Sequence, residues 1–386
     1  MTCSAVIGST TSFLVTLAFL WAVIRLVRRD FPLTRVPEAR TLAVVMALFF
    51  AVEALCGFIS YNGTPTLKEI IENLVFLSFL PLYSRLSVTS RENLRDALET
   101  AAIIGAFAAL LFSFYQARFL HIRAEGGAGN AAPFAVASMV GYSILWLACL
   151  RADGSRRLLL VAAICASAAC ILLSGTRSLW PGLLIVPVVD GSIYRKHLSA
   201  HGLGRAAVIL SVLTACTGVL VANLVEKRAE LAVQDVSAAL DMDNYSGSFG
   251  KRLIMWQIGL DLFKKSPLFG QGPGNAQPLL KKESFALTGT ELSYSHYHDV
   301  FLNYAVRDGV FGVLIVLAMI FAPLFLAARY ERDEIGTYGF AFLAAMEISF
   351  LLSGVMGIMF GQDIMDALFM ISAITGSYLV FGAMPR

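Results

Sequence analysis

Long apolar stretches separated by shorter polar connections dominate the pattern of this chain. Several stretches approach the roughly 20 residues that a helix needs to cross about 30 Å of hydrocarbon. Because backbone groups in lipid must find partners within the protein, helices are the expected spanning elements. The pattern predicts an all-α polytopic membrane protein with about eleven spans, and ten or twelve stay open because the stretch at 179–190 is short and contains Pro181 and Pro187. The predicted spans lie near 5–25, 41–60, 68–84, 98–118, 131–150, 157–174, 179–190, 205–223, 310–328, 337–357 and 364–382.

One connection, residues 224–309, is far longer than the others. Connections of this length are usually functional. Apolar residues recur at helical spacing within 250–275, which predicts an amphipathic helix that lies on the membrane surface or docks on the bundle. Pro267 and the glycines after it then end this helix in a tight turn. The helical positions are Leu253, Trp256, Leu260 and Phe263, and the turn glycines are Gly270, Gly272 and Gly274. The chain is thus divided into a bundle at 1–223, the long loop, and C-terminal spans at 310–386.

Basic residues alternate between the two sides of the membrane along the chain. Connections on one side are rich in arginine, from Arg25 and Arg28 near the start to Arg329 and Arg332 near the end, whereas the short loops opposite contain few. Cytoplasmic loops carry an excess of Lys and Arg. The distribution therefore predicts an outside N-terminus, an inside C-terminus and an extracytoplasmic long loop.

The composition agrees with a membrane protein and narrows its partners. Hydrophobic residues make up 57% of the chain and charged residues 15%, whereas about a quarter of an ordinary soluble domain is charged. The net charge of +3 is small, and the expected surroundings are membrane lipids, with no nucleic acid. The six cysteines fall almost entirely in apolar stretches and are interpreted as buried hydrophobes without a disulfide framework.

Polar residues gather in the stretch "SHYHDVFLNYAVRDGVFG" at 295–312, although the chain has only five histidines. If a helix runs from His298 into the next span, His298, Gly309 and Gly312 share one stripe, because eleven residues at about 100° each return to within roughly 20° of the start. The glycines would let a neighbouring helix approach closely under the histidine. Alternatively, His298 is an interfacial residue that caps the helix, and the glycines serve packing alone. His296 would line the same cleft or lie at the interface.

Three arginines lie on the same predicted face as His298. Arg177, in "LLSGTRSLWPG", ends a span; Arg252 opens the amphipathic stretch; and Arg123 lies in the Gly-rich loop "HIRAEGGAGNAAPF". A guanidinium at the end of a span is costly without a partner, although snorkelling to the surface or simple solvation are alternatives. Arginine suits bidentate phosphate contacts and stays charged. The three arginines and His298 together indicate that the protein binds an anionic group at its outer surface.

These segments resemble the O-antigen ligase family. "HDVFLNYAVRDGVFG" fits the family's histidine motif, with His298, Gly309 and Gly312 at its fixed positions, although the family usually has Asn, Ser or Gln where this chain has Asp299. "SGTRSLW" looks like the family's Ser-x-Arg segment and places its arginine at Arg177. "KRLIMWQIGLDLFKKSPLFGQGPGN" looks like its Arg-x-x-x-Trp segment and places the second arginine at Arg252. The resemblance covers roughly residues 160–330.

The resemblance implies a GT-C-like membrane glycosyltransferase in the bacterial inner membrane, active on the periplasmic face. Such enzymes move a glycan from undecaprenyl diphosphate to an acceptor hydroxyl, here of a lipid A–core or a polysaccharide. Arg177 and Arg252, with Arg123 as a third candidate, would hold the diphosphate. His298 would accept the proton of the acceptor, and direct displacement would invert the anomeric centre. Asp299, His296, Gly309 and Gly312 would support the site.

Two alternatives and the question of a metal stay open at this point. A polysaccharide polymerase contains the same segments, and a lipid-linked glycan flippase would use charges within the membrane, for which Glu53 and Glu347 are the candidates. Either carboxylate could form an ion pair with an arginine of the site. No metal and no cofactor are expected, because the first outer loop, 61–68, lacks the carboxylate pair of many GT-C enzymes and "DMDN" at 241–244 is interpreted as a solvated loop.

Overall fold

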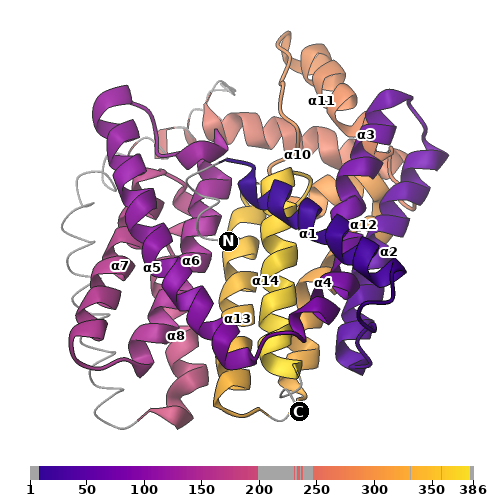
Figure 1. Cartoon of the computed structure of the whole chain (residues 1–386). Coiled ribbons are helices and arrows are strands. Elements are labelled where there is room, and N and C mark those ends of the chain that lie inside the picture. The colour runs from indigo at the N-terminus through magenta and orange to yellow at the C-terminus, as the bar shows by residue number, and fades with distance from the viewer. Residues whose placement is uncertain are drawn as a thin grey trace.

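The computed structural model describes residues 8–198, 230, 233–234, 236–237, 247–330, 332–357 and 359–382, and within them every regular element is a helix. Eight of these helices are long and apolar enough to cross a membrane, so the chain is a multi-pass membrane protein (Figure 1). The predicted span at 205–223 and the sequence at 241–244 lie outside the described residues. The eight helices are α1 (Thr10–Val27), α2 (Pro37–Ile59), α5 (Arg91–Tyr115, continued by a π-helical turn Gln116–Leu120), α6 (Ala131–Arg151), α7 (Gly154–Leu173), α12 (Val300–Ala328), α13 (Glu334–Gly354) and α14 (Asp363–Phe381).

Two of the predicted spans are not long helices. The stretch at 68–84 is broken into α3 (Thr64–Glu72), a 3-10 helix (Asn73–Ser78) and α4 (Phe79–Leu86). The stretch at 179–190 is α8 (Gly182–Tyr194), whose 13 residues are shorter than the roughly 20 that cross the hydrocarbon. The shorter remaining elements are α10 (Ser248–Lys265), α11 (Pro273–Thr288) and 3-10 turns at Gly126–Ala128, Arg177–Leu179 and Arg195–His197.

Helices α6, α13 and α14 form the centre of the bundle, and α1 lies at its periphery (Figure 1). Nearly all of α6 and α14 is buried, as expected for helices that are apolar on every side. In α1, by contrast, Phe13, Leu14 and Leu20 are about half exposed or more and are suited to contact lipid. The interior is therefore built mainly from α6, α13 and α14.

The expected amphipathic helix is present as α10, which lies across one end of the bundle and packs on α12 (Figure 1). Its buried face, however, consists of Ile254, Met255, Ile258 and Leu262, and the predicted stripe residue Leu260 is 50% exposed. The helix ends at Lys265, and the glycine-rich turn after Pro267 leads into α11, as the sequence predicts.

This turn packs backbone to backbone against α12 and breaks that helix at Gly309. The amide of Gln271 donates to the carbonyl of Val306 (2.7 Å), and the amide of Val310 donates to the carbonyl of Pro267 (2.8 Å). Gly309 adopts φ 65° and ψ −151°, which is not helical. The prediction of one continuous helix from His298 through Gly312 is therefore wrong, because the turn occupies the side of α12 where the helix would have continued.

Candidate functional site

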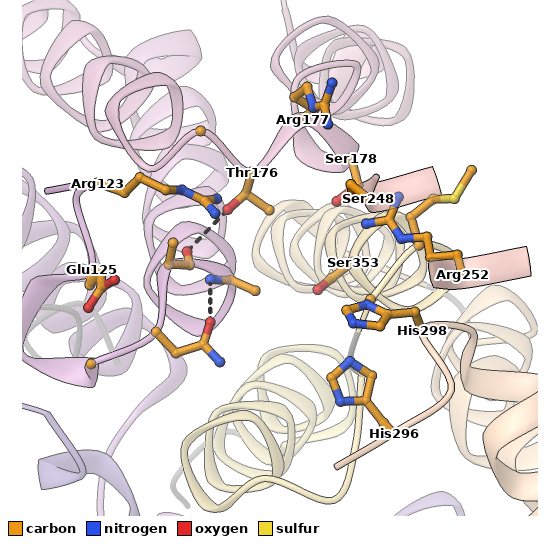
Figure 2. A pocket seen from close by; sticks show the side chains of 17 residues that line it. Arg123, Glu125, Thr176, Arg177, Ser178, Ser248, Arg252, His296, His298 and Ser353 are labelled. Atoms are coloured by element: carbon orange, nitrogen blue, oxygen red, sulfur yellow. Dashed lines mark hydrogen bonds between the residues drawn. The ribbon is translucent and has the colours of Figure 1, made fainter. Parts of the chain in front are cut away.

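A cavity of about 640 Å³ lies at the end of the bundle that carries α10. It is bounded by side chains from separate parts of the chain, which Figure 2 shows around an open centre. They come from the loop before α6, the turn after α7, the first turns of α10, the loop before α12 and the end of α13. All five basic and histidine residues singled out in the sequence line this cavity: Arg123, Arg177, Arg252, His296 and His298.

Arg123 and Arg177 are placed by two loops that are built against each other. The Nε of Arg123 donates to the carbonyl of Ser174 (2.7 Å), and the hydroxyl of Thr176 donates to the carbonyl of Ala131 (3.3 Å). Gly175, with φ 64°, allows the close contact, since a Cβ there would lie only 3.2 Å from the Nε of Arg123. The two loops therefore form one wall of the cavity, and both guanidiniums belong to it (Figure 2).

The two histidines belong to the loop before α12. Between them, Tyr297 is buried and its hydroxyl donates to the carbonyl of Ala276 in α11 (3.0 Å). Tyr297 is thus held against α11, while His296 and His298 on either side of it both line the cavity. Their ring centroids are 4.3 Å apart (Figure 2). His298 also adopts φ 54°, a conformation that is uncommon for non-glycine residues and is enriched at functional sites.

Both imidazoles are held in their neutral form. Burial, followed by the charge of Arg252, lowers the pKa of His298 to about 4, against a weaker opposing hydrogen bond that the imidazole donates to the Met356 backbone. Burial, followed by the charges of His298 and Arg252, lowers the pKa of His296 to about 3. A neutral imidazole has a lone pair that can accept a proton, so the pair is suited to base chemistry at neutral pH.

The cavity is cationic overall. Arg252, from the second turn of α10, lies beside His298 (Figure 2), opposite the wall formed by Arg123 and Arg177. Against these three guanidiniums, the described lining residues include one carboxylate, Glu125. Preorganised cations in a partly desolvated site stabilise developing negative charge. Within the described ranges, no three His, Cys, Asp or Glu side chains lie close enough to hold a metal ion.

Three residues expected to support the site lie outside the cavity lining. The carboxylate of Asp299 accepts from the amide of Leu302 (2.8 Å) and caps α12, so it acts on the helix rather than on the adjacent histidine. A Cβ at Gly309 would lie 2.4 Å from the carbonyl oxygen of Leu268, and one at Gly312 would lie 2.6 Å from the Cβ of Asp308. Among the described residues, the atoms nearest to these positions belong to the α10–α11 turn and to α12 itself, so the two glycines admit the turn and the kink.

The two carboxylates expected inside the membrane differ in their surroundings. Glu53 forms a buried ion pair with Arg307 (2.8 Å), a residue of α12 that the sequence analysis did not single out and that does not line the cavity. Glu347 is also buried, and neither of its oxygens has a hydrogen-bond partner among the described residues. Arg307, in "AVRDG", stands two residues before the motif glycine Gly309, but nothing in the sequence alone indicated that it would turn inward.

Comparisons with known proteins lead to the same family as the sequence motifs. Residues 160–317 match the family model described as O-antigen ligase. This segment is therefore similar to O-antigen ligases, and it covers less than half of the chain. Over 267 residues, 68% of this chain and 61% of its relative, the sequence is 25% identical to an O-antigen ligase from Escherichia coli. Over 299 residues, 75% of this chain and 72% of its relative, it is 23% identical to an uncharacterised protein from Haemophilus influenzae.

The matched segment includes Arg177, Arg252 and His298, whereas Arg123 precedes it. The loop that carries Arg123 is nevertheless joined to this segment by its bond to Ser174 and lines the same cavity. The similarity to O-antigen ligases, together with the membrane-spanning helices, supports a membrane glycosyl-transfer or ligase role for the protein.

Proposed function

We propose that the protein transfers a glycan from undecaprenyl diphosphate to an acceptor hydroxyl on the periplasmic face of the bacterial inner membrane. The observation that carries this proposal is that three arginines and two neutral histidines, remote in the sequence, line one cavity of about 640 Å³. Cavities of about 300–1,000 Å³ can bury a drug-sized ligand. The space therefore suits a diphosphate together with part of the attached glycan.

The periplasmic location rests on the distribution of arginine between the two ends of the bundle. Helix α6 begins at the cavity, is 21 residues long and ends at Arg151, so the basic connections at that end lie a full span away. There, Arg151 and Arg156 both pair with Glu99, at 2.9 Å and 2.7 Å. Since arginine-rich connections face the cytoplasm, the cavity faces outward.

In the proposed reaction, Arg177, Arg252 and Arg123 hold the diphosphate, and His298 accepts the acceptor proton. The acceptor oxygen forms a bond to the anomeric carbon while the bond from that carbon to the diphosphate oxygen breaks, which inverts the centre. The leaving diphosphate takes the bonding electrons, and the arginines stabilise its negative charge. No metal takes part in this scheme.

The low pKa of His298 in the empty cavity fits a base that is activated by its substrate. The charge of Arg252 contributes to lowering this pKa, and a bound diphosphate would compensate that charge. An opposite charge nearby favours the protonated form of a histidine. The donor itself would therefore raise the basicity of His298 at the moment when a base is required.

The test is transfer by the purified protein in proteoliposomes with an undecaprenyl-diphosphate glycan, with and without EDTA. Lipid A–core and a second copy of the lipid-linked glycan serve as separate acceptors, because the first product identifies a ligase and the second a polymerase. The similarity to an O-antigen ligase from E. coli favours the first. Glycan translocation without bond formation, or activity abolished by EDTA and restored by a metal, would contradict the proposal.

A further inference from the structure

The acidic residue in the cavity has no place in the phosphate chemistry. Glu125 lies on the wall opposite Arg252 and His298, at the left of Figure 2, and is the sole carboxylate among the described lining residues. A carboxylate in contact with a diphosphate would repel it, because like charges close together in a partly buried site are unfavourable. Glu125 must therefore face a part of the cavity that holds something other than the phosphates.

The backbone that carries Glu125 is fixed by a buried side chain. The Oε1 of Gln116 accepts from the amides of Glu125 (2.9 Å) and Gly126 (3.0 Å), and its Nε2 donates to the carbonyl of Gly126 (2.9 Å). Gln116 is only 6% exposed. The loop is also tied at Ala124, whose amide donates to the carbonyl of Leu173 (3.2 Å). Glu125 thus stands on a preorganised support, which lowers the entropic cost of binding a ligand.

The side chain of Glu125 lines the cavity on the same loop as Arg123. The Nε of Arg123, two residues away, donates to the carbonyl of Ser174 (2.7 Å). A half-buried carboxylate of this kind suits neutral donors. Hydroxyl groups form short, charge-assisted bonds to carboxylates, and two adjacent hydroxyls of a sugar ring match the two oxygens of one carboxylate.

We propose that Glu125 binds hydroxyl groups of a sugar and thereby helps to determine which glycan the cavity accepts, an inference that rests on the proposed transfer function. The arginines and histidines would handle the diphosphate and the proton, while the Glu125 wall would orient a ring. Gln116 is the positioning residue for this contact. The sugar belongs either to the donor glycan or to the acceptor, and the chemistry of the contact is the same for both.

The experiment measures initial transfer rates of Glu125→Ala and Glu125→Gln in proteoliposomes, with donor and acceptor varied separately. Loss of one hydrogen bond to a charged group corresponds to about 10- to 100-fold in binding. We expect the KM of one substrate to rise by about that factor in Glu125→Ala, with kcat changed by less than about threefold. The substrate whose KM moves identifies the source of the sugar. Glu125→Gln, which keeps an accepting oxygen, should show a smaller rise.

Glu291→Gln is the matched control, since Glu291 is exposed and does not line the cavity. Unchanged KM values for both substrates in Glu125→Ala would overturn the inference while leaving the transfer function intact. A fall in kcat without a change in KM would also overturn it, because Glu125 would then act on the proton. If the wild-type protein transfers nothing, calorimetry with the delipidated donor oligosaccharide and the free core oligosaccharide decides: binding lost in Glu125→Ala supports the inference, and binding unaffected overturns it.

Discussion

The guanidinium of Arg307 lies 2.8 Å from the carboxylate of Glu53, and both side chains are buried within the bundle. The same Nη2 contacts Glu69 in α3 at 2.9 Å. The backbone carbonyl of Arg307 accepts from the amide of Gly272 (2.9 Å), in the turn between α10 and α11. One residue thus joins α2 and α3 through its side chain and the support of α10 through its backbone, and α10 carries Arg252.

Arg307→Met is expected to destabilise the protein strongly. Removing one partner of a buried ion pair leaves an uncompensated charge and costs about 3–5 kcal/mol. Here the substitution leaves Glu53 without its cation and Glu69 without one of its contacts. The measurement is the free energy of unfolding in detergent, obtained from thermal or denaturant transitions.

Two further variants control this result. Adding Glu53→Gln to Arg307→Met removes the orphaned charge and should recover part of the lost stability. Lys264→Met breaks an exposed pair with Asp261 and should change stability by about 1 kcal/mol or less. Equal losses in Arg307→Met and Lys264→Met would show that the buried pair does not stabilise the bundle.

Gly309→Ala is expected to disrupt the contact between α12 and the α10–α11 turn. Gly309 has φ 65° and ψ −151°, a region that is nearly restricted to glycine and costs about 1–3 kcal/mol for other residues. The new Cβ would also lie 2.4 Å from the Leu268 carbonyl, so the turn must move. Unfolding of the purified variant should occur at a clearly lower temperature. Transfer activity should fall because this turn joins the end of α10, the helix that carries Arg252, to α12.

Gly289→Ala separates the cost of the backbone conformation from the cost of the steric contact. Gly289 also has a positive φ, 69°, but a Cβ there would meet nothing within 4 Å. This variant should lose only the conformational part, about 1–2 kcal/mol. If both glycine variants lower the unfolding temperature equally, the close approach of the turn to Gly309 does not contribute to stability.

The long apolar helices and the motif residues could be predicted from the sequence, because hydropathy and spacing are local properties. The division of the 68–84 stretch into three short helices could not be predicted from the sequence, since it depends on Glu69 and Asn73 turning inward. Glu69 contacts Arg307, and the side-chain amide of Asn73 donates to Glu53 (3.2 Å). A hydropathy window averages over such residues and does not register their partners, of which Arg307 is 238 residues away from Glu69.

The expectation of a continuous helix from His298 through Gly312 failed for a similar reason. Helical periodicity placed Gly309 beneath it, but a turn from another part of the chain determines the backbone at Gly309. Glu125 escaped notice for a different reason: its loop was quoted for Arg123, and only the cavity shows that a carboxylate stands in the same wall. Sequence patterns identified which residues carry charge, and the tertiary contacts determine which of them meet.

Arg177→Ala and Arg252→Ala are each expected to lower kcat. Removing one preorganised donor to a developing negative charge costs about 10²–10³ in kcat. Lysine keeps the charge but loses the bidentate geometry, so Arg177→Lys and Arg252→Lys should retain more activity than the alanine variants and less than the wild type. The readout is the steady-state transfer rate at saturating donor, with protein amount and membrane insertion verified.

Arg118→Ala is the matched control for these variants. Arg118 is exposed, lies in the π-helical turn that continues α5 and does not line the cavity. Its substitution should leave the rate unchanged. Equal rates in Arg118→Ala and in the two cavity variants would remove the arginines from the proposed chemistry.

The pH dependence of transfer tests His298 as the base. Since its pKa is lowered to about 4 in the empty cavity, the neutral form persists as the pH falls from 7, and kcat/KM should decline only as the pH approaches about 4. An unperturbed histidine would cause a decline near pH 6.5. Because kcat reports the donor-bound state, and the diphosphate offsets the charge of Arg252, the decline in kcat should occur at higher pH than the decline in kcat/KM.

Arg252→Gln should shift the pH at which kcat/KM declines, and the direction of the shift can be predicted. Burial is the larger cause of the low pKa and remains in this variant, whereas the charge of Arg252 is removed. The decline in kcat/KM should therefore shift upward, toward 6.5 but not to it. His298→Ala should lower the rate by about 10²–10⁴ and abolish the acidic limb altogether. If kcat/KM declines at the same pH in Arg252→Gln as in the wild type, or still declines at acidic pH in His298→Ala, another group accepts the proton.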